Sequence, residues 1–150
     1  TVGVAPRIKE LSQDAPNGLR LALSLHAPTQ TLREYLLPKA ARAWRLPELM
    51  DALRTYEEAS QTGVLLEYIL LAGLNDTEEC AEALVDLITS ARLQHAGINL
   101  IPYNPTDAGA EAGFKSPSDK RCKDFRATLR RRGVHNVTVR FSTKIGRSVS

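Results

Sequence analysis

Polar side chains end several apolar segments of the sequence, and their types suit ligand binding. Ser24 and His26 close the apolar run 19–25, and Tyr103 and Asn104 follow the apolar run 97–101. Hydroxyl, imidazole and carboxamide groups donate and accept hydrogen bonds, as do the backbone amides beside them. These residues predict a site for a polar ligand such as a nucleoside or an amino-acid group.

Each candidate also has a purely structural interpretation. His26 precedes a proline-containing turn that its ring could fix in place, and Asn104 could satisfy backbone groups of a local turn. The sequence at Asn75 and Asp76 favours a turn and a helix cap over a binding site. Glu67 interrupts an apolar strand, and a buried carboxylate needs a partner. Its side chain either points into a barrel interior or pairs with a Lys or Arg.

The sequence lacks the residue patterns of metal-binding and phosphate-binding sites. The histidines stand at 26, 95 and 135 with no HExxH pair, and no Gly-rich phosphate loop occurs. Cys80 and Cys122 fall in predicted helices without metal-ligand spacing. We interpret both cysteines as structural, and we expect no metal ligand in this chain.

The elements that must position these residues alternate between strand and helix. Such alternation predicts an α/β domain with a parallel sheet, wound open or rolled into a barrel, whose ligands bind at the carboxyl ends of the strands. No linker interrupts residues 1–150, so we expect a single domain. The expected strands are 1–4, 19–25, 64–71, 97–101 and 137–141, and the expected helices are 7–13, 29–36, 46–60, 77–93 and 118–132.

Composition narrows the class of protein. The chain is 43% hydrophobic and 25% charged, which is typical of a globular domain. It has no apolar run long enough to span a membrane and no visible signal peptide. With only two cysteines, we expect a reducing compartment, either the cytoplasm or an organellar matrix or stroma.

Charge is unevenly distributed. Residues 1–110 carry nine Lys and Arg against fourteen Asp and Glu, whereas residues 111–150 carry eleven against three. The basic C-terminal flank, 111–150, fits either a nucleic-acid contact or a solvated helix face. If it contacts RNA, Lys120, Arg121, Arg130, Arg131 and Arg132 are the expected contact residues.

Several stretches, in order, resemble RlmN/Cfr-type radical SAM RNA methyltransferases. They are TVGVAP at 1–6, LALSLHAPTQTLR at 21–33, EYILLAGLND at 67–76, INLIPYNP at 98–105, GFKSPS at 113–118 and VTVR at 137–140. The resemblance implies the C-terminal part of a radical SAM core. Its fold would be a partial (β/α)6 TIM-like barrel, present here as an incomplete barrel of about five strands.

The resemblance also implies a function and a set of cofactors. Members of the family methylate an adenine of large-subunit rRNA, and some also act on tRNA, using S-adenosylmethionine and a [4Fe-4S] cluster. Matched residue by residue, the S-adenosylmethionine contacts are Ser24, Leu25, His26 and Asn104. The expected partner is therefore rRNA, tRNA or a ribosome, and not a membrane.

Other family motifs have no counterpart in the sequence. The CxxxCxxC cluster motif and the Gly-Glu-Pro stretch are absent, and the segment with the methylated cysteine would begin just after residue 150. The loop at 38–40 also departs from the family's Pro-Ile-Asn. We expect these 150 residues to be part of a longer enzyme and to be inactive alone. The alternatives are a catalytically inactive descendant that serves as an RNA- or ribosome-binding structural component, or a TIM-barrel enzyme of another chemistry.

Overall fold

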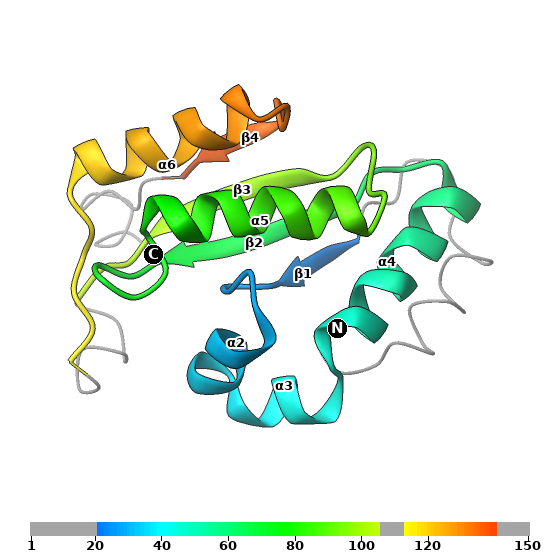
Figure 1. The fold of residues 1–150 in the computed structure, drawn as a ribbon, viewed down its shortest axis with the longest axis horizontal. Coiled ribbons are helices and arrows are strands. Elements are labelled where there is room, and N and C mark those ends of the chain that lie inside the picture. Colours follow the sequence, from blue (N-terminus) through cyan, green and yellow to red (C-terminus); the bar gives the residue numbers. More distant parts are fainter. Residues whose placement is uncertain (1–20, 106–112, 141–150) are drawn as a thin grey trace, which may run out of the picture.

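The computed structural model describes residues 21–105 and 113–140 (Figure 1). Within these ranges, strands and helices alternate along the chain as the sequence predicts, except that three helices in succession separate the first two strands. Residues 38–40, expected from the sequence to form a loop, instead begin a helix, because Pro38 fits the first turn of a helix. The strands are β1 (Ala22–Ser24), β2 (Leu65–Leu70), β3 (Gly97–Pro102) and β4 (Val137–Val139). The helices are α2 (Gln30–Leu36), α3 (Pro38–Ala43), α4 (Leu46–Ser60), α5 (Glu78–Ser90) and α6 (Asp119–Arg131).

The four strands form one sheet in the order β1-β2-β3-β4, and every neighbouring pair is parallel. Sequential parallel strands need a crossover connection, which α4, α5 and α6 provide. This arrangement confirms the predicted α/β class and is consistent with part of a TIM-like barrel. The expected strand at 1–4 and the expected helix at 7–13 lie outside the described residues.

The two faces of the sheet differ in character. Along β2 the side chains alternate between half-buried and buried, and Leu66, Tyr68 and Leu70 are fully buried. They join a core with apolar residues of α4, α5 and α6, in which the Tyr68 and Phe125 rings lie 5.3 Å apart. Figure 1 shows α5 and α6 side by side along this face. The opposite face carries the alternate residues of each strand.

Hydroxyl side chains fix where three helices begin. Thr29 Oγ1 accepts a hydrogen bond from the Leu32 N–H, and Thr77 Oγ1 accepts one from the Cys80 N–H. Ser118 caps α6 in the same way. Each cap satisfies a backbone donor with no partner inside the helix and stabilises it by about 1 kcal/mol. None of the helices in the described part of the chain has the length and apolarity needed to cross a bilayer.

Candidate functional site

The turn after β1 is held against β2 by backbone and side-chain hydrogen bonds. The buried Leu25 donates its N–H to the Glu67 carbonyl at 2.9 Å. His26 follows with a φ of 60°, in the left-handed region that non-glycine residues seldom adopt. Its Nδ1 accepts a hydrogen bond from the Ile69 N–H at 3.0 Å. The ring therefore ties the turn to the neighbouring strand, as the structural interpretation of His26 predicts.

The surroundings of the His26 ring determine its charge and which of its nitrogens carries the proton. Burial, together with the nearby Arg33 charge, lowers the pKa of His26 from 6.5 to about 4. The imidazole is therefore neutral at pH 7. Since Nδ1 accepts a hydrogen bond, the ring proton lies on Nε2, which makes Nε2–H a hydrogen-bond donor. His26 thus combines a structural role at one nitrogen with a donor at the other.

Asn75 holds the turn from the other side. Its Nδ2 donates to the carbonyls of His26 at 2.9 Å and Ile69 at 2.7 Å, and its Oδ1 accepts from the Leu71 N–H at 2.7 Å. The side chain is fully buried, and each of these bonds is internal. Asn75 is therefore a structural clamp, which confirms the turn interpretation of this segment. The sequence does not reveal that the clamp reaches His26, because the two residues are far apart in the chain.

Arg33 supports the end of β1 from helix α2. Its side chain is fully buried; Nε donates to the Leu25 carbonyl and a terminal nitrogen donates to the Ser24 carbonyl, both at 3.3 Å. Burial lowers the pKa of Arg33. An arginine in a short helix gives no sequence signal of such a role, and sequence reasoning missed it.

Asn104 and the residues after β3 stand at the same edge of the sheet as Ser24 and His26. The buried Tyr103 donates its N–H to the Leu70 carbonyl at 3.0 Å, and its ring packs edge-on against Phe114. Asn104 is half-buried. Because β2 lies between β1 and β3, one strand separates the two groups of candidates. The structure therefore brings the predicted residues to one edge of the sheet but not onto neighbouring strands.

A row of four polar residues crosses the sheet on the face away from the core. Ser24, Glu67, Asn99 and Thr138 are register partners on β1, β2, β3 and β4. Thr138 Oγ1 donates to Asn99 Oδ1 at 3.2 Å, and Asn99 is buried. Glu67 is half-buried, and no ion pair joins it to a Lys or Arg of the described residues. Of the two predictions for Glu67, the structure supports a side chain on the inner face of a barrel.

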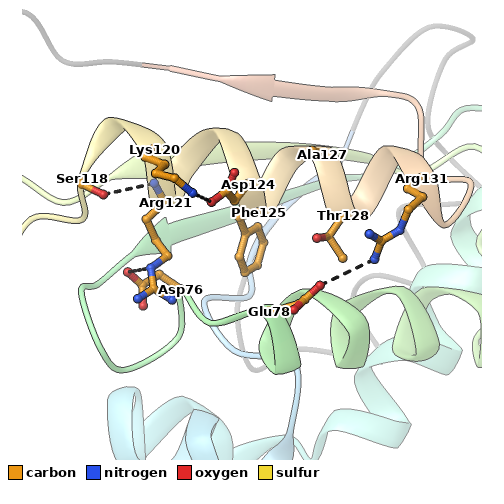
Figure 2. A pocket seen from close by; sticks show the side chains of 10 residues that line it. All are labelled: Asp76, Glu78, Ser118, Lys120, Arg121, Asp124, Phe125, Ala127, Thr128 and Arg131. Atoms are coloured by element: carbon orange, nitrogen blue, oxygen red, sulfur yellow. Dashed lines mark hydrogen bonds and ion pairs between the residues drawn. The ribbon is translucent and has the colours of Figure 1, made fainter.

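A groove along α6 lies away from these residues (Figure 2). It has a volume of about 710 Å³ and runs between the start of α5 and α6. Its polar groups bind one another: Asp76, only 2% exposed, accepts from the Gly73 N–H at 2.9 Å and pairs with Arg121 at 3.8 Å. The lining includes none of the predicted S-adenosylmethionine contacts. We therefore do not assign the ligand site to this groove.

Four of the five predicted RNA contacts pair with carboxylates of the chain itself. Lys120 pairs with Asp124 at 2.8 Å and Arg121 pairs with Asp76. Arg131 reaches Glu78 and Glu82, and Arg132 reaches Glu82 and Asp86. The fifth, Arg130, donates to the Val137 carbonyl at 3.2 Å. Their role in RNA binding remains a prediction.

Both cysteines are free thiols in the described part of the chain. Cys122 is buried in α6, where burial raises the pKa of its thiol, and Cys80 Sγ lies 3.9 Å from the Leu74 carbonyl. Across residues 21–105 and 113–140, no three His, Cys, Asp or Glu side chains group as metal ligands. The described residues therefore do not fit an iron–sulfur cluster.

Comparison with known proteins identifies the relatives. No family model matches the chain. The "Probable dual-specificity RNA methyltransferase RlmN" of Synechococcus elongatus is 40% identical over 151 residues, which cover 97% of this chain and 40% of the relative. The "Dual-specificity RNA methyltransferase RlmN" of Lawsonia intracellularis is 39% identical over 138 residues, 91% of this chain and 36% of the relative.

A solved structure agrees with the sequence relatives. A radical SAM methyltransferase from Sphaerobacter thermophilus superposes with a TM-score of 0.85 and 37% identity, over 100% of this chain and 41% of that one. This chain is homologous to the RlmN-type radical SAM methyltransferases. The chain spans about 40% of the length of the curated relatives it matches. A domain of pyruvate-formate lyase-activating enzyme from Bacteroides vulgatus, at 16% identity and a TM-score of 0.65, shares the fold.

Proposed function

We propose that this RlmN-type chain supplies the strand-end half of an S-adenosylmethionine site in a longer radical SAM RNA methyltransferase. The whole protein methylates an adenine base of large-subunit rRNA and accepts tRNA as a second substrate. The names of the RlmN relatives support an RNA methyltransferase. The choice of adenine and of ribosomal RNA comes from the family resemblance of SLHAP and INLIPYNP.

The observation that carries the proposal is the fixed, neutral His26 at the carboxyl edge of the sheet. Its ring is positioned by Ile69 and its backbone by Asn75, so Nε2–H has a fixed direction. A fixed donor binds a ligand acceptor without first losing side-chain entropy. The Ser24 hydroxyl and the Asn104 carboxamide add donors and acceptors at the same edge. This set suits the ribose, the adenine and the amino-acid group of S-adenosylmethionine.

The residues of this chain bind and orient the cofactor and do not react. Ser24, His26 and Asn104 would hold S-adenosylmethionine, which would supply the radical chemistry and the methyl group in the longer protein. Ile69 is half-buried next to the polar strand ends and would limit the access of water to the bound cofactor, whereas the Leu25 side chain is part of the hydrophobic core. The sequence has no CxxxCxxC motif, so the cluster ligands of the full-length protein must come from outside this chain.

The test uses the full-length protein, reconstituted with iron and sulfide under anaerobic conditions. S-adenosylmethionine affinity is measured by equilibrium dialysis for the wild type and for the His26→Ala and Asn104→Ala variants. We expect each substitution to weaken binding by about 10-fold, the effect of losing roughly one hydrogen bond to a ligand. The matched control is His135→Ala, because this exposed histidine follows α6 and lies away from the strand ends.

Three outcomes separate the candidate functions. Weaker cofactor binding in both variants, together with adenine methylation by the wild type, supports the proposal. Unchanged affinity in both variants would show that His26 and Asn104 do not bind S-adenosylmethionine. RNA binding without any S-adenosylmethionine binding by the wild type would instead indicate the structural, RNA- or ribosome-binding component.

A further inference from the structure

Helix α6 separates its basic residues onto two flanks. One flank faces α5, where Arg131 and Arg132 pair with Glu78, Glu82 and Asp86 (Figure 2 shows the pair of Arg131 with Glu78). The other flank faces β4, because a terminal nitrogen of Arg130 donates to the Val137 carbonyl. The two flanks differ in whether their charges are already neutralised.

Three basic residues share the β4 flank. Lys123, Arg126 and Arg130 are spaced by three and four positions, which aligns them along one side of a helix. At 1.5 Å per residue the row extends roughly 10 Å along the helix axis. We call these three residues the basic stripe. Lys123 and Arg130 are exposed and Arg126 is half-buried.

The basic stripe keeps its positive charge. Within residues 21–105 and 113–140, no carboxylate forms an ion pair with Lys123, Arg126 or Arg130. The hydrogen bond from Arg130 goes to a neutral carbonyl, so it orients the guanidinium without cancelling its charge. Asp119 lies on the same flank, one turn before Lys123, but forms no ion pair with the stripe either.

Paired and unpaired cations contribute differently to binding a polyanion. A cation that releases a counterion from a phosphate steepens the salt dependence of binding. An arginine held by two carboxylates must first break those bonds, and it leaves two negative charges beside the phosphate. The charges that face α5 are therefore poor phosphate contacts, although their side chains are exposed.

We propose that the basic stripe Lys123, Arg126 and Arg130 contacts the RNA phosphate backbone. The paired Arg121, Arg131 and Arg132 instead stabilise the packing of α6 on α5 and on the turn before it, and Lys120 pairs within α6. This assignment rests on the proposed function, because it takes RNA as the polyanion. It replaces most of the contact residues expected from composition and retains only Arg130.

The experiment compares two double variants of the full-length protein that remove equal charge from the same helix. Lys123→Gln with Arg126→Gln removes two of the three charges of the stripe, and Arg131→Gln with Arg132→Gln removes two charges that pair with α5. Binding to a transcribed tRNA and to a large-subunit rRNA hairpin is measured by fluorescence anisotropy at several KCl concentrations. Thermal unfolding of each variant is recorded in parallel.

We expect the salt dependence of RNA binding to change in the stripe variant and not in the paired-flank variant. The stripe double variant should lower the slope of log affinity against log salt concentration by about 1.4 to 1.8, which corresponds to the loss of roughly two phosphate contacts. The paired-flank variant should keep the wild-type slope within about 0.3 and unfold at a lower temperature. This pattern would support the assignment.

Two other results would overturn it. If the wild type binds RNA and the stripe variant shows the same slope, the stripe does not contact the RNA backbone. The proposed function would be unaffected by this result. If the paired-flank variant loses more slope than the stripe variant, Arg131 and Arg132 contact the RNA and the assignment to the stripe is wrong. A wild-type protein that binds neither RNA would contradict both the stripe and the proposed function.

Discussion

The Nδ1 atom of His26 accepts a hydrogen bond from the backbone N–H of Ile69 at 3.0 Å, across the gap between β1 and β2. This bond needs an unprotonated Nδ1, so it holds only while the imidazole is neutral. One residue thereby couples the packing of two strands to pH. It also fixes which nitrogen of the ring is left to face a ligand.

Acidification should therefore loosen the turn after β1. The pKa of His26 is about 4 in the fold and 6.5 when unperturbed, so the folded state disfavours the charged ring. The stabilising contribution is complete above pH 6.5 and is lost as the pH falls towards 4. Between pH 7.5 and pH 5 the wild type should lose about 2 kcal/mol of unfolding free energy through this group. Urea denaturation at both pH values checks this; His26→Gln should lose less, and His135→Gln should behave like the wild type.

Arg33 should act on the same titration. Its buried guanidinium is the second cause of the low pKa of His26, after burial itself. Replacing Arg33 with methionine keeps a long side chain and removes the charge, so the pKa of His26 should rise above about 4. An NMR pH titration of the His26 ring protons in a folded Arg33→Met variant measures this directly. A pKa equal to that of the wild type would show that the charge of Arg33 has no effect on the ring.

Asn75 should be among the costliest polar side chains to remove. Asn75→Ala deletes three buried hydrogen bonds and leaves the His26 and Ile69 carbonyls and the Leu71 N–H without partners. We expect a loss of roughly 3 kcal/mol, because each unsatisfied buried group costs about 1 kcal/mol or more. Thr77→Ala, which removes only the α5 cap, should cost about 1 kcal/mol. Urea unfolding of both variants compares the two; an equal, small effect would mean that Asn75 does not clamp the turn.

The ion pairs between α5 and α6 should contribute modestly to stability and should depend on salt. Arg132 is 40% exposed and Glu82 34% exposed, so solvent screens their attraction. A double-mutant cycle with Glu82→Gln and Arg132→Gln should give a coupling energy below about 1 kcal/mol at low salt and less at 0.5 M KCl. A coupling that salt does not reduce would contradict a screened surface pair.

The sequence predicts the strand–helix order well because apolar runs and helix caps are local signals. The strands found at 65–70 and 97–102 match apolar runs, and Thr77 caps the helix that follows the first of them. The family resemblance of SLHAP and INLIPYNP also selects the edge of the sheet where the candidates gather.

What the sequence does not predict depends on contacts between distant residues. The bond from Asn75 to the backbone of His26 joins positions 49 residues apart, and no periodicity reports it. The burial of Arg33 follows from the packing of α2 against the end of β1. The basic flank illustrates the same limit, because a composition count cannot show that Arg131 and Arg132 already hold carboxylates of α5.

The polar row across the sheet has a consequence for how the strands align during folding. A shift of β3 by one residue against β2 would turn Asn99 toward the core and bring Ile98 or Leu100 out to the other face. A buried carboxamide without partners among Leu66, Tyr68 and Phe125 would cost several kcal/mol. A misaligned pairing is thus unfavourable on both faces of the sheet, so the polar row also helps to select the correct strand alignment.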